Sequence, residues 1–83
     1  TDKCELGIKK YKKGDKEPAH FHKKSDEITV ILSGRVRMGK KIFYKDDIIF
    51  IEKNETTDFY AMEDTITVVY KSSSIQNDKY FLD

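Results

Sequence analysis

Apolar and polar residues alternate along most of the chain with the two-residue period of β-strands, and no stretch has the period of a helix. The first strand is expected from Cys4 to Tyr11, where Cys4, Leu6 and Ile8 alternate with polar residues. The next is expected to start at Pro18, where a missing N–H costs little. Further strands are predicted at residues 27–32, 35–38, 41–44, 48–51, 57–61 and 65–70.

Short turn signals such as Ser33-Gly34 and Gly39-Lys40 separate these strands. Short, evenly spaced strands predict an all-β sandwich or barrel, and 83 residues allow one small domain. We therefore expect a single domain over residues 1–83. Its barrel is expected at about residues 4–71, and residues 72–83 are expected to form a C-terminal tail or a closing strand.

The most informative motif is Gly-x5-His-x-His-x4-Glu-x6-Gly, formed by Gly14, His20, His22, Glu27 and Gly34. In an extended strand His20 and His22 project to one side, and Glu27 opens the next apolar run, from which it can reach the same side. Two imidazoles and one carboxylate are a ligand set of non-haem metal sites that keep open positions. The motif therefore predicts that His20, His22 and Glu27 bind a metal.

This motif resembles the first sequence motif of the cupin superfamily, with every element at an allowed spacing, and the resemblance covers about residues 14–70. It implies a small double-stranded β-helix, the jelly-roll β-barrel of cupins. A second family motif, roughly Gly-x5-Pro-x-Gly-x2-His-x3-Asn, fits best from residue 46, but every defining residue is replaced. Its positions hold Asp46, Glu52, Asn54, Thr57 and Ala61. Thr57 therefore stands where the resemblance implies a fourth metal ligand.

Three ligands leave the identity of a divalent metal open among Fe, Mn, Zn and Ni. Iron(II) would permit oxygen chemistry, whereas zinc or manganese would favour Lewis-acid work. We expect a small-molecule-binding cupin, and the resemblance implies a sugar or a small organic acid as ligand. The alternatives are an Fe(II)-dependent oxygenase and a non-catalytic ligand-binding, regulatory or dimerisation cupin without metal. The sequence does not decide whether the protein is an enzyme.

Other residues are candidates for the wall of a ligand pocket. Barrels of this size can hold one small molecule. Arg35 and Arg37 alternate onto one face and could bind a carboxylate or a phosphate. Glu55 could reach the mouth of the site. The remaining candidates are Phe59, Tyr44, Phe50 and Met62.

Charge divides the chain into two halves, although the net charge is only +1. Residues 1–45 hold 13 Lys and Arg against 6 Asp and Glu, and residues 46–83 hold 3 against 9. The basic residues are mostly lysines, and Tyr11 is the one aromatic inside the lysine run, so we expect a solvated face and no nucleic-acid binding. The basic cluster consists of Lys9, Lys10, Lys12, Lys13, Lys16, Lys23 and Lys24.

No apolar run approaches the roughly 20 residues needed to span a bilayer, so no membrane partner is expected. The single Cys4 cannot form an internal disulfide, and no signal peptide precedes the domain, so we expect a cytoplasmic location. If Glu27 points into the barrel, then Ile28, Val30 and Leu32 face outward. Such an apolar stripe predicts a homodimer through this sheet.

Overall fold

The computed structural model describes residues 4–72 and 79–81, and within these ranges the chain forms strands and no helix. The nine strands are β1 (Glu5–Tyr11), β2 (Lys16–His22), β3 (Glu27–Ser33), β4 (Arg35–Met38), β5 (Lys41–Tyr44), β6 (Ile48–Ile51), β7 (Thr57–Ala61), β8 (Thr65–Lys71) and β9 (Lys79–Phe81). Within the described ranges, then, no helix could cross a membrane.

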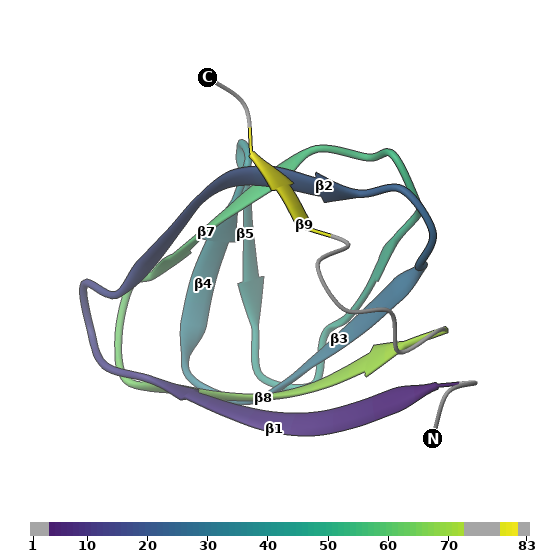
Figure 1. Ribbon diagram of the computed structural model, residues 1–83. Helices are drawn as coiled ribbons and strands as arrows, with labels where there is room; N and C mark the ends of the chain where they lie inside the picture. The colour runs from purple at the N-terminus through teal and green to yellow at the C-terminus, as the bar shows by residue number, and fades with distance from the viewer. Residues whose placement is uncertain (1–3, 73–78, 82–83) are drawn as a thin grey trace.

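Two antiparallel sheets face each other across the barrel. One has the strand order β1-β8-β3-β6 and the other β5-β4-β7-β2-β9. Figure 1 looks into the barrel, with β1 and β8 along its lower side and β2 and β9 along its upper side. Neighbours such as β1 and β8 are far apart in sequence, which is the connectivity of a jelly roll. The predicted all-β fold is therefore confirmed.

Most strand bounds agree with the sequence pattern, and β4, β5, β6 and β7 agree at both ends. The main difference is β2, which starts at Lys16 and not at Pro18. The register between β2 and β7 shifts by one residue between Glu17 and His20, so Pro18 lies in a bulge. A bulge leaves a residue outside the hydrogen-bonded ladder, which is why proline is tolerated inside this strand. Of the region expected as a tail or closing strand, residues 79–81 form β9, and residues 73–78 and 82–83 lie outside the described residues.

The hydrophobic core fills the space between the two sheets. It consists of Ile31, Val36, Ile49, Ile51, Phe59 and Ala61, with Tyr11, Met38 and Phe43 packed against it. Ile31, Val36 and Ala61 are fully buried. These residues occupy alternate positions of β3, β4, β6 and β7, so the two-residue period places them on the inner faces.

Two turns explain how the degenerate second motif keeps its backbone. Asp46 and Asn54 are the non-glycine residues with positive φ in the described ranges, at 75° and 68°. They stand at the two positions where the second cupin motif has glycine. Asp and Asn tolerate this conformation better than other side chains. The replaced motif therefore retains the turns of the fold even though it has lost its histidine.

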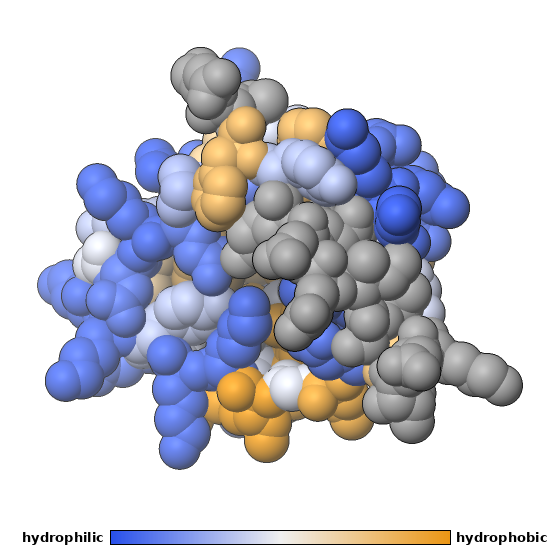
Figure 2. Space-filling view, in the orientation of Figure 1, coloured by the Kyte–Doolittle hydropathy of each residue, from blue (hydrophilic) through white to orange (hydrophobic). Residues whose placement is uncertain are grey.

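The outer face of the four-stranded sheet is apolar. Leu6, Ile8, Ile48 and Phe50 are more than half exposed there, at 70%, 67%, 72% and 55%. Figure 2 shows the corresponding hydrophobic patch along the lower side of the molecule, at β1. Thr29 and Ile31 are buried, so the alternate residues of β3 face outward. These are Ile28, Val30 and Leu32, and they join the apolar face between β8 and β6.

Candidate functional site

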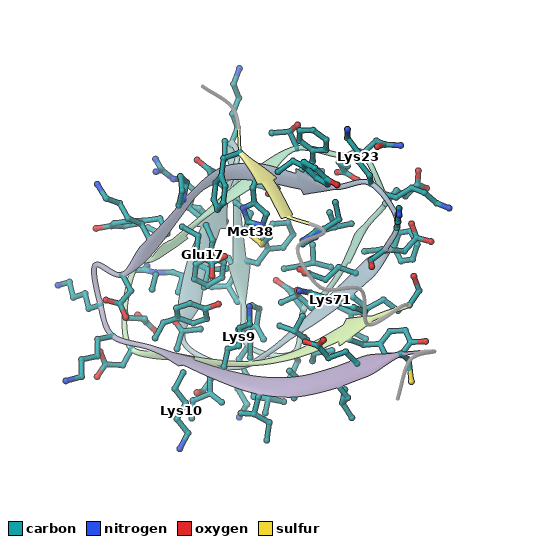
Figure 3. All side chains as sticks on the ribbon, viewed as in Figure 1. Lys9, Lys10, Glu17, Lys23, Met38 and Lys71 are labelled. Atoms are coloured by element: carbon teal, nitrogen blue, oxygen red, sulfur yellow. The ribbon has the colours of Figure 1, made fainter. Side chains whose placement is uncertain are left out.

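A pocket opens between the two sheets at the end of the barrel that holds the motif. It encloses a cavity of about 20 Å³, which is room for one water-sized group. His20, His22, Glu27 and Thr57 all line it. The other lining residues are Lys9, Tyr11, Glu17, Thr29, Met38, Asp58, Phe59, Thr67, Val69 and Lys71. Figure 3 shows Lys9, Glu17, Met38 and Lys71 inside the ring of strands.

The bulge in β2 decides which of its side chains reach this pocket. Glu17 lies opposite Phe59 and His20 lies opposite Thr57, with one extra residue on β2 between these pairs. Without the extra residue, a strand with Glu17 inward would turn His20 and His22 outward. The bulge therefore allows Glu17, His20 and His22 all to point into the barrel.

The bulge also orients His20. Its Nδ1 lies 2.9 Å from the carbonyl oxygen of Pro18. A neutral imidazole that donates from Nδ1 carries its lone pair on Nε2, which is the nitrogen then able to bind a metal. The ring is buried and packs beside Phe81 of β9, with a centroid separation of 5.8 Å. Contacts of this kind hold a ligating histidine in one orientation.

His22 and Glu27 face each other across the pocket. His22 Nε2 and Glu27 Oε1 are 3.9 Å apart, and the two imidazole rings of the motif meet edge to face at 5.4 Å. The second carboxylate oxygen of Glu27 accepts a hydrogen bond from Thr29 Oγ1 at 3.0 Å. This bond directs Oε1 toward His22, so two of the three candidate ligands, His20 and Glu27, are each oriented by a neighbouring group.

These side chains are of the right kind for a metal but stand slightly too far apart. Two donors bound to one metal at about 2.1 Å lie roughly 3.0–3.4 Å apart, whereas the His22 to Glu27 distance is 3.9 Å. Accordingly, within residues 4–72 and 79–81, no three His, Cys, Asp or Glu side chains are close enough to hold a metal together. A closing movement of about half an ångström to one ångström would bring this pair to ligand spacing.

Thr57 lies beside His20 on β7, the neighbouring strand of the same sheet, at the position where the resemblance implies a fourth ligand. It is half-buried, and its hydroxyl donates to the carbonyl oxygen of Asp58 at 3.1 Å. A neutral threonine hydroxyl is a weak metal ligand compared with imidazole or carboxylate. Its place at the pocket suits a hydrogen bond to a bound ligand or water.

Tyr11 adds a hydroxyl that stays protonated. Burial raises the pKa of Tyr11 well above its usual value, and the carboxylates of Glu17 and Glu27 raise it further. The phenol donates to Glu17 Oε1 over 3.5 Å, and its ring lies 4.4 Å from that of Phe59. Tyr11 is therefore a fixed hydrogen-bond donor in the pocket over the whole neutral and mildly alkaline range.

The other candidate wall residues fall in different places, and of these only Phe59 lines the pocket. Tyr44 and Phe50 are 54% and 55% exposed. Glu55 accepts a hydrogen bond from the Glu52 amide at 3.1 Å and closes a turn. Alternation defines two faces of a strand, but only packing decides which face is inside.

The arginines and Met62 also lie outside this pocket. Val36 is buried, so Arg35 and Arg37 on either side of it point outward on β4. The guanidinium of Arg35 is 3.8 Å from the Glu63 carboxylate, and that of Arg37 lies 5.4 Å from the ring centre of Tyr60. Met62 follows β7, and its amide donates to the Arg35 carbonyl at 2.9 Å.

Sequence reasoning missed the contribution of the opposite sheet. Lys9 lines the pocket although the basic cluster to which it belongs is expected on a solvated face, and Lys71, for which the sequence predicts no role, lines it as well. A signal was available for Lys9, since it shares the strand face of Tyr11 and alternates with Ile8 and Lys10. The positions of Lys71 and Thr67 in the pocket could be recognised only from the pairing of β8 with β1 and β3.

No family model matches the chain, and no curated protein matches it. Among solved structures, KdgF from Halomonas sp. is similar with a TM-score of 0.82 and 17% identity, over 93% of this chain and 74% of KdgF. An RmlC-like cupin from Shewanella frigidimarina NCIMB 400 is similar with a TM-score of 0.84 and 12% identity, over 92% and 71% of the two chains. The DMSP lyase DddQ from Ruegeria pomeroyi DSS-3 matches with a TM-score of 0.80 and 16% identity, over 98% of this chain and 44% of DddQ. The chain therefore has the fold of the cupin superfamily, a double-stranded β-helix, as its first motif predicts.

Proposed function

We propose that this cupin binds a small molecule in the pocket between its sheets, next to a divalent metal held by His20, His22 and Glu27. The observation that carries the proposal is the orientation of these three side chains toward one buried pocket. His20 is oriented by the Pro18 carbonyl and Glu27 by the Thr29 hydroxyl. Partners of this kind are typical of residues that bind metals.

The chemistry of the donors limits what such a metal would be. Imidazole and carboxylate together suit Fe, Mn, Zn or Ni, and a bound metal of this group would supply Lewis acidity or, as Fe(II), oxygen chemistry. The Thr57 hydroxyl beside it would orient a ligand by hydrogen bonding, while the protonated Tyr11 phenol donates to Glu17 and orients that carboxylate. The similar structures include a DMSP lyase, which supports a small-molecule role for the barrel and leaves the substrate open.

Metal uptake by the protein tests the proposal. Protein stripped with EDTA is offered Fe(II), Mn(II), Ni(II) and Zn(II) in turn, and bound metal is measured by elemental analysis. We expect about one metal per chain and a rise in melting temperature, because a ligand at a hundred times its Kd stabilises the folded state by about 2.7 kcal/mol. In His22→Ala the affinity should fall by about 100-fold or more, since one of three ligands is lost.

A matched control separates ligand loss from a general effect of substitution. Glu63→Gln changes a half-exposed carboxylate that pairs with Arg35 on the surface, so metal affinity should not change. Glu27→Gln provides a second test in case His22→Ala fails to fold. If wild-type protein retains no metal and its melting temperature does not respond, the metal site is ruled out and the alternative of a cupin without metal is supported. Consumption of O₂ by the Fe(II) form would favour the oxygenase.

We further propose that the apolar outer face of the four-stranded sheet pairs with the same face of a second copy. The face carries Leu6, Ile8, Ile48 and Phe50 at high exposure, with the stripe Ile28, Val30 and Leu32 between them. An apolar face without charge complementarity needs an apolar partner, and a two-fold dimer supplies one from the same chain. An 83-residue domain also gains from the added buried surface, because its own core is small.

Substitution of an exposed residue tests this pairing without disturbing the core. Ile8→Lys is expected to weaken the dimer by more than about 100-fold, because it would bury an unpaired ammonium at a cost of about 3 kcal/mol or more. Ile42→Lys is the control, since Ile42 is 42% exposed on the other sheet. Sedimentation equilibrium measures both. A wild-type protein that stays monomeric at high micromolar concentration would rule out the proposed pairing.

A further inference from the structure

We propose that the pocket contains a carboxylate-binding subsite formed by Lys9, Thr67 and Lys71, which makes a small organic acid its ligand. The subsite lies on the inner face of β1 and β8, opposite the strand that carries the two histidines. The inference rests on the proposed function in one respect, namely that the ligand enters this pocket. It does not require the metal.

Both lysines point into the barrel although lysine is normally exposed. Lys9 and Lys71 are half-buried and line the pocket. Figure 3 shows Lys9 and Lys10 on opposite sides of β1, with Lys9 and Lys71 inside the ring of strands. Lys9 pairs with Thr67 across the β1–β8 ladder, and Lys71 continues the same face of β8 beyond Val69. The two ammonium groups therefore approach one space from adjacent strands.

Neither the Lys9 nor the Lys71 ammonium group has a counter-ion among the residues that the structure describes. Within these ranges, no carboxylate lies within 4.0 Å of either nitrogen, although Glu27 is directly across the ladder from Lys71. The carboxylate of Glu27 accepts from Thr29 and faces His22, and that of Glu17 accepts from Tyr11. Half-buried charges without partners are costly, and an anionic ligand would relieve that cost.

Thr67 provides an independent sign of a missing ligand. Its side chain is 0% exposed and lines the pocket, yet its Oγ1 makes no hydrogen bond within the described part of the chain. Buried hydroxyl groups are nearly always hydrogen-bonded in folded proteins. A carboxylate held between the lysines would accept a hydrogen bond from this hydroxyl. One ligand would then give Thr67 a hydrogen-bond acceptor and both ammonium groups a counter-ion.

The local charge on the inner side of β1 and β8 favours an anion. The other charged groups of the pocket are the carboxylates of Glu17, Glu27 and Asp58, and each of them already accepts a hydrogen bond, from Tyr11, Thr29 and the Gly39 amide respectively. Lys9 and Lys71 have no carboxylate partner of this kind in the described ranges. The small cavity, about 20 Å³, favours a compact head group over a sugar ring.

NMR titration of metal-free protein with sodium acetate, at constant ionic strength and pH 7, tests the subsite. Lys9→Met and Lys71→Met preserve side-chain length and remove the charge. Each is expected to weaken acetate binding by about tenfold or more, because a hydrogen bond to a charged group is lost. Thr67→Val should weaken it by a smaller factor. Lys10→Met is the matched control, since Lys10 is exposed on the outer side of the same strand, and it should bind acetate as the wild type does.

The outcomes separate this inference from the metal site. Acetate binding that depends on Lys9 and Lys71, in protein that never takes up metal, supports the subsite while removing the metal from the proposed function. Metal uptake with acetate binding that is absent, or equal in the Lys9→Met and Lys10→Met variants, overturns the subsite alone. Inorganic phosphate that binds more tightly than acetate overturns the assignment to a carboxylate. Circular dichroism of each variant confirms that it is folded before it is titrated.

Discussion

Gly34→Ala is expected to remove at least about a third of the free energy of unfolding of the protein. Gly34 joins β3 to β4 with a φ of +98°, and an added Cβ would meet Thr65 Oγ1, the Asp64 carbonyl oxygen at 2.5 Å and Thr65 Cα at 2.7 Å. Two of these three atoms are backbone, so they cannot move aside without displacing the start of β8. We expect a loss of at least about 4 kcal/mol, against a total stability of roughly 4–12 kcal/mol for a domain of this length.

Gly14→Ala is the matched control for this substitution. Gly14 has a similar φ of +93°, but an added Cβ would meet no atom within 4 Å. Only the conformational cost of a left-handed alanine applies, which is about 1–2 kcal/mol. Urea unfolding followed by circular dichroism measures both variants. Equal losses in the two would show that backbone conformation, and not the contact with Thr65, makes Gly34 necessary.

Ile31→Ala is expected to destabilise the protein by about 3–4 kcal/mol, the second largest effect on stability. Ile31 is fully buried at the centre of the core on β3, and its strand also carries Glu27 and Thr29. A cavity at this position removes packing contacts that hold β3, the strand that carries Glu27 and Thr29 of the pocket. We therefore expect the midpoint of urea unfolding to fall sharply, with the slope unchanged if unfolding stays two-state.

Ile42→Ala serves as the comparison for this cavity. Ile42 is 42% exposed on β5, so truncation removes little buried surface and should cost below about 1 kcal/mol. A loss at Ile31 no larger than the loss at Ile42 would mean that the core closes around the cavity and is less tightly packed than the burial of Ile31 indicates.

The positions of the strands were largely predictable because the signal is local. The bounds of β4 to β7 follow from alternation and from turn residues within each segment. The start of β2 was wrong by two residues, because a proline normally marks a strand end and only the pairing with β7 reveals the bulge around it. The two glycine positions of the degenerate motif were placed correctly on turns, where Asp46 and Asn54 keep the backbone conformation.

The candidate site was predictable only on one side. His20, His22 and Glu27 were singled out by their spacing and Thr57 by the resemblance to the second cupin motif, and the structure brings all four to one pocket. The assignment of metal binding to them stays a prediction. The wall residues were harder, because alternation assigns Arg35, Tyr44 or Phe50 to a face without saying which face is enclosed. Burial of Val36 turns the arginines outward, and pairing with β3 turns Phe50 to the outside.

The sequence by itself determined the strands, the turns and the motif that identifies the fold, since each depends on residues within a short stretch of chain. Only the tertiary structure decided what the pocket contains. The register of β8 against β1 and β3 brings Lys9, Thr67 and Lys71 together, and the bulge in β2 turns the histidines to meet them. Pairing partners and register are long-range properties of a sheet, and a shift of one residue exchanges its inner and outer faces.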